Sequence, residues 1–152
     1  MRILCLDIGT KRIGIAATDP MGWTAQGIAV IERSGGDKDL GEIARFVSEL
    51  EAEMIVVGLP LNEEGEMGPE AERVRKFADR LEAYLEKNGT ELPVKMWDER
   101  YSTAIAEERL IELDVSRKRR KEVIDKMAAV VILEDYLGSN DISPERDENV
   151  EG

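Results

Sequence analysis

The chain has 152 residues and a formal net charge of -12, with 42% hydrophobic and 36% charged residues. This length fits one domain, and the composition is typical of a soluble globular protein. Because we find neither a membrane-length apolar run nor a signal peptide, we expect a cytoplasmic protein without membrane contact. An acidic chain is a poor general binder of nucleic acid, so the positions of its basic residues matter more than their number.

The chain contains no histidine and a single cysteine, Cys5. These counts exclude an internal disulfide, histidine-dependent nucleophilic catalysis and the usual zinc and copper sites. Cys5 lies in an apolar segment, which predicts a buried thiol rather than a nucleophile. Any metal would have to be held by oxygen ligands, which favours Mg²⁺ or Mn²⁺.

Hydrophobic periodicity predicts an α/β fold. The expected strands are 3–8, 13–18, 26–32, 54–60 and 93–100. The expected helices run from about Leu40 to Leu50, from Pro69 to Asn88, from Ser102 or Thr103 to about Leu113, and from Ser116 to about Leu137. Three consecutive strands followed by alternating helices and strands predict a mixed sheet with helices on its faces.

The sequence changes in character after Leu137, where "GSNDISPERDENVEG" carries five acidic residues and one basic residue. This segment has little apolar surface to bury. We therefore expect a domain over residues 1–137 and an acidic, disordered tail over residues 138–152.

An aspartate, Asp7, lies within the first apolar strand. Alternation puts it on the same face as Ile3 and Cys5. Burying a carboxylate without a partner costs several kcal/mol. Either Asp7 ends the strand and accepts hydrogen bonds from the turn amides of Gly9 and Thr10, or it faces a cation.

Two further acidic positions have both a structural and a functional interpretation. Asp98 and Glu99 come where the last strand ends, and alone they are typical of a solvated cluster in which Glu99 pairs with Arg100. Asp125 lies in a strongly apolar helix and could simply pair with Lys121, four residues earlier.

Taken together, these acids predict a metal site. An aspartate on a central strand, one at the end of a neighbouring strand and one on a covering helix could converge on Mg²⁺ or Mn²⁺. Such ions can stabilise the attacking and leaving oxygens of a phosphodiester. A cation would also compensate the charge of Asp7. We therefore predict Asp7, Asp98 and Asp125 to be catalytic and metal-binding.

Basic residues are concentrated in "RKRRK", residues 117–121. Cations near a helix N-terminus oppose the helix dipole, so phosphate binding explains this run better than a solvated helix start. The predicted nucleic-acid contacts are Lys11, Arg12, Arg100, Arg117, Lys118, Arg119, Arg120 and Lys121.

Four ordered motifs resemble the YqgF family, also called RuvX-type pre-16S rRNA nucleases or Holliday junction resolvases. They are "DIGTKRIGIA" (7–16), "VVGLPLNEEGEMGPEAERVRKFA" (56–78), "DERYST" (98–103) and "VSRKRRKEVIDKMAAVVIL" (115–133). The resemblance implies a ribonuclease H-like fold, with a five-stranded mixed sheet in the order 3-2-1-4-5. It also implies a metal-dependent nuclease whose acids correspond to Asp7, Asp98 and Asp125, with Glu99 and Arg100 assisting.

One position departs from the wider superfamily, whose second acid usually stands at the end of the fourth strand. Residues 58–60, "GLP", occupy that place here. Either Asp98 substitutes from the next strand, or an acid of the following loop reaches in. The candidate loop acids are Glu63, Glu64 and Glu66.

We therefore expect a metal-dependent endonuclease that processes the 5′ end of pre-16S rRNA. A Holliday junction resolvase is the first alternative, and a non-catalytic RNA-binding assembly factor is the second. "DIGT" also opens nucleotide-binding sugar kinases and actin-like ATPases, but those proteins need two such domains. We expect a monomer or weak homodimer, with Met21 and Trp23 packed on the domain rather than marking a partner contact.

Overall fold

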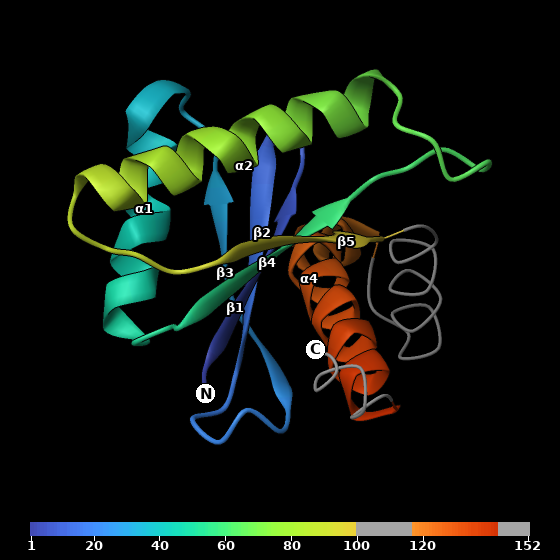
Figure 1. Ribbon diagram of the computed structural model, residues 1–152. Coiled ribbons are helices and arrows are strands. Elements are labelled where there is room, and N and C mark those ends of the chain that lie inside the picture. The colour runs from blue at the N-terminus through green and yellow to red at the C-terminus, as the bar shows by residue number, and fades with distance from the viewer. Residues whose placement is uncertain (100–116, 143–152) are drawn as a thin grey trace.

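The computed structural model describes residues 1–99 and the helix over residues 117–142, with side chains in that helix described for residues 127–139. Its five strands form one sheet in the order β3-β2-β1-β4-β5 (Figure 1). The strands are β1 (Ile3–Ile8), β2 (Arg12–Thr18), β3 (Ala25–Glu32), β4 (Met54–Leu59) and β5 (Val94–Asp98). The pairs β1–β2 and β2–β3 are antiparallel, while β1–β4 and β4–β5 are parallel. The mixed sheet and its strand order are confirmed.

Helices cover both faces of this sheet. They are α1 (Gly36–Glu49), α2 (Pro69–Lys87) and α4 (Arg117–Ile142). The first two lie on one side of the sheet and α4 lies on the other (Figure 1). The helix expected between about residues 102 and 113 falls outside the described residues.

Two element ends differ from expectation. The strand expected to reach residue 100 ends at Asp98. The last helix continues past Leu137 to Ile142, so the first part of the expected tail is helical. A single glycine, Gly138, costs a helix only about 1 kcal/mol, which is too little to end a long helix that is packed on a sheet. Residues 143–152 lie outside the described part.

The central strand β1 contributes to two hydrophobic cores. Leu4 and Leu6 pack with α1 and α2, whereas Ile3 and Cys5 pack with α4. Cys5 is fully buried, as expected of a core thiol. The same alternation puts Asp7 on the α4 face, at the carboxyl end of the strand.

The contacts of α4 fix its direction along the sheet. The indole N–H of Trp97 donates to Asp135 at 2.8 Å, and its ring meets Tyr136 edge to face at 5.2 Å. Tyr136 lies against Met54, at the start of β4, and Ile132 lies against Gly58, near its end. Because α4 runs antiparallel to β4, its earlier residues extend toward the carboxyl end of the strand.

A buried ion pair holds the loop between β3 and α1. Arg33 lies 3.5 Å from Asp39, which also accepts hydrogen bonds from the amides of Ser34 and Gly35. Burial raises the pKa of Asp39, but the two amides and the guanidinium outweigh it and hold that pKa below its usual value of 3.8. The loop is thereby fixed beside the carboxyl end of the sheet.

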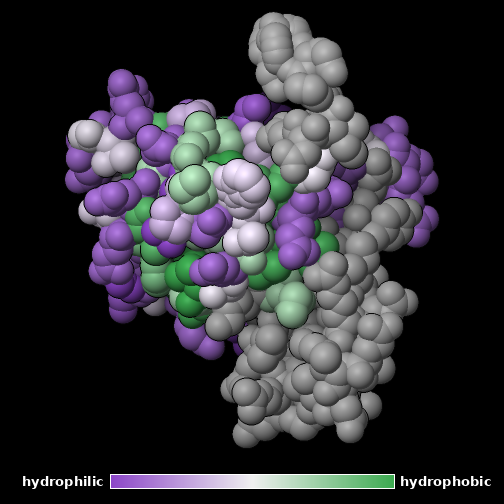
Figure 2. All heavy atoms as spheres, turned by 90° about the horizontal axis from the view of Figure 1, so that it is seen from below, coloured by the Kyte–Doolittle hydropathy of each residue, from purple (hydrophilic) through white to green (hydrophobic). Residues whose placement is uncertain are grey.

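Met21 and Trp23 are exposed, so the prediction that they pack on the domain is wrong. Their exposed fractions are 69% and 77%. The carboxylate of Asp19 accepts the backbone N–H of Trp23 and Thr24, which fixes this turn without burying its apolar side chains. Figure 2 shows green and pale residues among purple ones at this lower end of the molecule. Among the residues described, no helix has the length and apolar character needed to cross a bilayer.

Candidate functional site

Asp7 is half-buried and lies between two glycines on neighbouring strands. Gly14 is its cross-strand partner on β2. Gly58 follows the Leu6–Val57 pair on β4 and therefore lies beside Asp7 on the other side. Glycines in strand interiors commonly mark a close approach of another group, and here they leave room around the carboxylate.

In the tight turn after β1, one of the two amides that the structural interpretation assigns to Asp7 has another acceptor. The N–H of Gly9 donates to the carbonyl of Arg12 at 2.9 Å. A Cβ at Gly9 would lie 2.9 Å from the same carbonyl oxygen, so only glycine allows this close turn. The side chain of Glu99 forms a hydrogen bond with Asp7.

Glu99 crosses over Gly58 to reach Asp7. A Cβ added at Gly58 would lie 3.1 Å from both the Cδ and the Oε2 of Glu99. The backbone N–H of Glu99 donates to the carbonyl of Leu59 at 3.1 Å, which continues the β4–β5 contact past the end of β5. The Glu99 carboxyl group thus occupies the space that a side chain at the end of β4 would fill.

The environment of Glu99 strongly disfavours its charged form. Burial raises the pKa of Glu99 first, and the charge of Asp7 and the hydrogen bond with it raise that pKa further. Smaller contributions come from the charges of Glu70 and Asp98, and the resulting pKa is about 9. In the absence of a cation, Glu99 is therefore protonated at neutral pH and donates to Asp7.

The fully buried Cys5 lies below this pair of carboxyl groups. Burial raises the pKa of its thiol well above 9.0, and the charges of Asp7 and Glu99 raise it further. Because Glu99 is largely buried, it is not the solvated strand-end acid of its structural interpretation, and its pairing with Arg100 stays a prediction. Arg100, the predicted partner, lies outside the described residues.

Asp98 belongs to the opposite face of the sheet from Asp7. Val94 and Met96 pack with the α1–α2 core, and Trp97 packs with the α4 core. Alternation then assigns Asp98, the last residue of β5, to the α1–α2 face. The structure therefore brings Glu99, rather than Asp98, alongside Asp7, and a ligand role for Asp98 stays a prediction.

Asp125 lies in α4, and its side chain is outside the described part of that helix. Position 125 precedes Ile132 by seven residues, which is two helical turns. Because α4 runs antiparallel to β4, this position lies beyond Gly58 in the direction of the carboxyl end of the strand. Its predicted role as the third acid stays a prediction.

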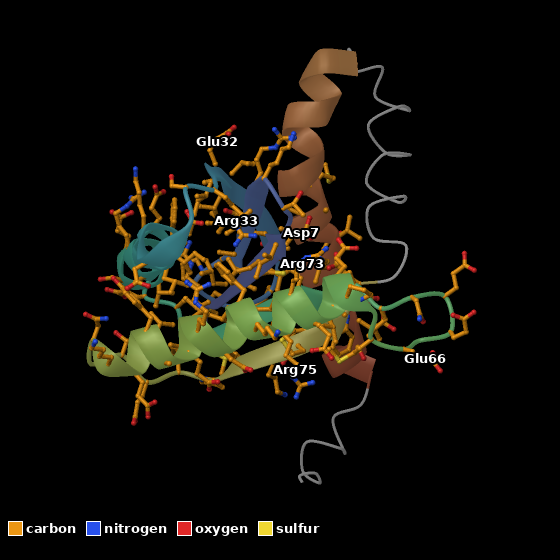
Figure 3. The ribbon with its side chains drawn as sticks, turned by 90° about the horizontal axis from the view of Figure 1, so that it is seen from above. Asp7, Glu32, Arg33, Glu66, Arg73 and Arg75 are labelled. Atoms are coloured by element: carbon orange, nitrogen blue, oxygen red, sulfur yellow. The ribbon has the colours of Figure 1, made fainter. Side chains whose placement is uncertain are left out.

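Among the acids of the loop after β4, Glu66 lies far from the site. Figure 3 shows it at the outer end of the loop, well away from Asp7. Glu63 and Glu64 are exposed in the same loop. A different acid, Glu70 in the first turn of α2, acts on Glu99 instead. Sequence reasoning missed Glu70 because an acid in the first turn of a helix is ordinary.

The donor set of the site fits Mg²⁺ or Mn²⁺. Asp7 and Glu99 share one proton because two close negative charges repel each other, and a divalent cation would remove that repulsion. All their donor atoms are oxygens, which these ions prefer. Within residues 1–99 and 127–139, no three acidic or cysteine side chains lie close enough together to hold a metal. A complete ligand set would therefore need a residue from another part of the chain.

A cavity of about 500 Å³ lies on the α2 side of the sheet, next to the turn that follows Asp7. The turn directly after Asp7 forms one wall, and Arg33 and the first half of α2 form the others. Of the predicted nucleic-acid contacts, Lys11 and Arg12 lie in that turn and at the start of β2. The other predicted cations are Arg100 and the side chains of residues 117–121, all outside the described part.

The strand order, the helices on both faces and the acid at the end of the central strand define a ribonuclease H-like fold. Two solved resolvases share this fold. T. thermophilus RuvC in complex with Holliday junction substrate is 14% identical, with a TM-score of 0.56 over 92% of this chain and 96% of that chain. The fowlpox virus Holliday junction resolvase is 16% identical, with a TM-score of 0.55 over 91% of this chain and 99% of that chain.

The chain belongs to the RuvX family. The family model described as "RuvX: Holliday junction resolvase" matches residues 1–139. A relative from Desulforamulus reducens, named "Putative pre-16S rRNA nuclease", is 50% identical over 91% of this chain and 98% of its own length. A Geobacillus relative of the same name is 51% identical over 91% and 99%. The family resemblance of the four motifs is thereby confirmed.

Proposed function

We propose that this chain is a metal-dependent endonuclease that hydrolyses phosphodiester bonds in the 5′ region of pre-16S rRNA. The observation that carries the proposal is the Asp7–Glu99 pair, held over Gly58 at the end of the central strand. The names of relatives about half identical to this chain support the nuclease activity and the RNA substrate. Such a protein would act in the cytoplasm.

Asp7 and Glu99 would hold Mg²⁺ or Mn²⁺, and Asp125 would complete the ligand set, whereas Asp98 would have to turn from the other face of the sheet to join them. When bound, such an ion supplies a nucleophile at neutral pH and stabilises charge on the phosphate. Asp125 is the better supported of the two additional acids, because its position on α4 lies toward the same end of β4 as Gly58.

The residues of the chain itself would then have two tasks. Glu99 holds a proton in the metal-free protein and would release it when a cation binds, which makes metal affinity rise with pH. Lys11 and Arg12, with Arg100 and the run 117–121, would hold flanking phosphates. Phosphate contacts set register and affinity and carry no sequence information.

Cleavage of two labelled substrates tests this proposal. One is a 5′ segment of pre-16S rRNA and the other is a four-way DNA junction, each incubated with Mg²⁺, Mn²⁺ or a chelator. We expect metal-dependent cutting of the RNA, and its loss in Asp7→Asn with folding intact or improved. Glu66→Gln is the matched control, because this acid lies away from Asp7 (Figure 3).

The outcomes separate the candidate functions. Cutting of the junction alone would favour a resolvase, the activity in the family description. Resolution needs two symmetric cuts and hence a dimer, so the same samples would be sized by light scattering. A folded protein that binds but cuts neither substrate, with Asp7→Asn equal to wild type, would replace the proposal by a binding factor.

A further inference from the structure

Helix α2 carries a row of basic residues that face the cavity beside the acids. Arg73, Lys76 and Arg80 line the cavity at spacings of three and four residues, which puts them on one stripe of the helix. Phe77, between them in sequence, is buried in the core below. All three basic side chains are exposed, in a chain whose net charge is -12.

Most exposed acids of α2 follow a separate stripe, comprising Glu72, Asp79, Glu82 and Glu86, whereas Glu70 lines the same cavity as the three cations. Arg75 lies on that side of the helix, and Figure 3 shows it opposite Arg73. Glu70–Arg73 and Glu72–Lys76 have the spacing of intrahelical ion pairs, but among the described residues no ion pair engages Arg73, Lys76 or Arg80.

Arg33 forms the facing wall and is already engaged. Its guanidinium donates to the carbonyl of Gly9 at 2.8 Å, lies 3.5 Å from Asp39 and lies over the ring of Phe77 at 5.0 Å. These contacts join the turn after β1, the loop before α1 and helix α2. Arg33 is thus a positioning residue that holds the cavity open beside the acids.

The wall of the cavity starts one residue after Asp7, although neither Asp7 nor Glu99 lines it. Its wall includes Ile8, Gly9 and Thr10, the three residues that follow Asp7. Glu70 also lines the cavity and raises the pKa of Glu99. Figure 3 shows Asp7, Arg33 and Arg73 on the same side of α2.

We propose that this cavity, which we call the α2 groove, binds the sugar–phosphate backbone of the substrate strand next to the bond that is cut. The cationic row spans seven residues, or about 10 Å of helix. Three cations along that length can each contact one phosphate of the strand. This inference rests on the proposed nuclease function and adds a binding surface on the opposite face of the sheet from α4.

The salt dependence of binding tests the α2 groove. The protein carries Asp7→Asn to prevent cleavage, and the probe is a labelled pre-16S 5′ RNA segment. The test variant replaces Arg73, Lys76 and Arg80 by Gln. The charge-matched control replaces three exposed cations away from the groove, Arg45, Arg75 and Lys95, by Gln.

Each phosphate contact contributes about 0.7 to the slope of log affinity against log salt for a single strand. The test variant should therefore lose about 2 from the slope, which over a fourfold rise in salt is roughly a 20-fold difference. The control should keep a slope close to that of wild type. A variant with Arg73→Lys and Arg80→Lys should also keep it, because the charges remain.

Equal slopes in the test and control variants would overturn the proposal that the α2 groove binds the substrate strand. If the unmutated protein still cleaved RNA, the nuclease proposal would stand. Failure of the unmutated protein to bind or cut any nucleic acid would instead overturn the nuclease proposal itself. Inorganic phosphate and ATP form a second arm. The inference would also be overturned if phosphate or ATP raised the melting temperature of the parent protein but not of the test variant, while both bound RNA equally well.

Discussion

Replacing Glu99 by Gln should remove a large pH dependence of stability that the acid pair creates in the metal-free protein. Burial, followed by the charge of Asp7, raises the pKa of Glu99 from 4.5 to about 9. Gln has nearly the same shape, keeps a donor for Asp7 and cannot ionise. The variant therefore isolates the titration of this one carboxyl group.

The sign and size of the effect follow from proton linkage. Between pH 4.5 and pH 9, the folded protein keeps a proton on Glu99 that the unfolded chain has released. The stabilising contribution is fully present below pH 4.5 and is lost as the pH rises through about 9. At 1.36 kcal/mol per pH unit, the free energy of unfolding should fall by about 3 kcal/mol between pH 4.5 and pH 7 through this group.

Urea unfolding at several pH values in a chelator measures the effect. We expect the wild type to lose stability across this range relative to Glu99→Gln, and Glu66→Gln to behave as the wild type. The reasoning is refuted if Glu99→Gln has the same pH dependence as wild type. Adding Mg²⁺ or Mn²⁺ should flatten the wild-type curve, because the bound cation takes the place of the proton.

Two other substitutions test the supports of the site. Gly58→Ala should abolish most cleavage and destabilise by about 1–3 kcal/mol, because its Cβ would lie 2.7 Å from the Cδ1 of buried Ile132 and 3.1 Å from the Glu99 carboxyl group. Gly138→Ala, with open space at its Cβ, should leave cleavage in the same assay unchanged. Arg33→Ala leaves the buried Asp39 without its ion pair and should lower the free energy of unfolding by about 2–3 kcal/mol above pH 3.8. That difference from wild type should shrink in acid, because Asp39 takes up a proton there. Urea titration at two pH values measures it, and the same difference at both values would show that the ion pair does not contribute.

The architecture was predictable because its patterns are local. Continuous apolar runs identified β1 and β4 as strands buried on both faces. The spacing of Leu40, Ile43 and Val47 identified the buried face of α1. The strand order itself came from the family resemblance, since no local pattern specifies which strands become neighbours.

The partner of Asp7 was not predictable, because it depends on which face Trp97 takes. Alternation puts Asp98 and Glu99 on opposite faces, so only one of them can meet Asp7. The choice is made by the contacts of Trp97 with Asp135 and Tyr136, both nearly 40 residues further along the chain. The spacing of residues along the sequence does not predict contacts between segments this far apart in the chain.

The glycine at position 58 and the glutamate at position 99 depend on each other. Neighbouring strands lie about 4.8 Å apart, so a carboxyl group from the end of β5 must cross β4 to reach β1. A Cβ at Gly58 would lie 3.1 Å from the Glu99 carboxyl group on that path. The missing acid of β4 and the acid after β5 therefore require each other. A glycine inside a buried strand, followed at the end of the next strand by glutamate, is a pattern that sequence reasoning can use to find such an exchange.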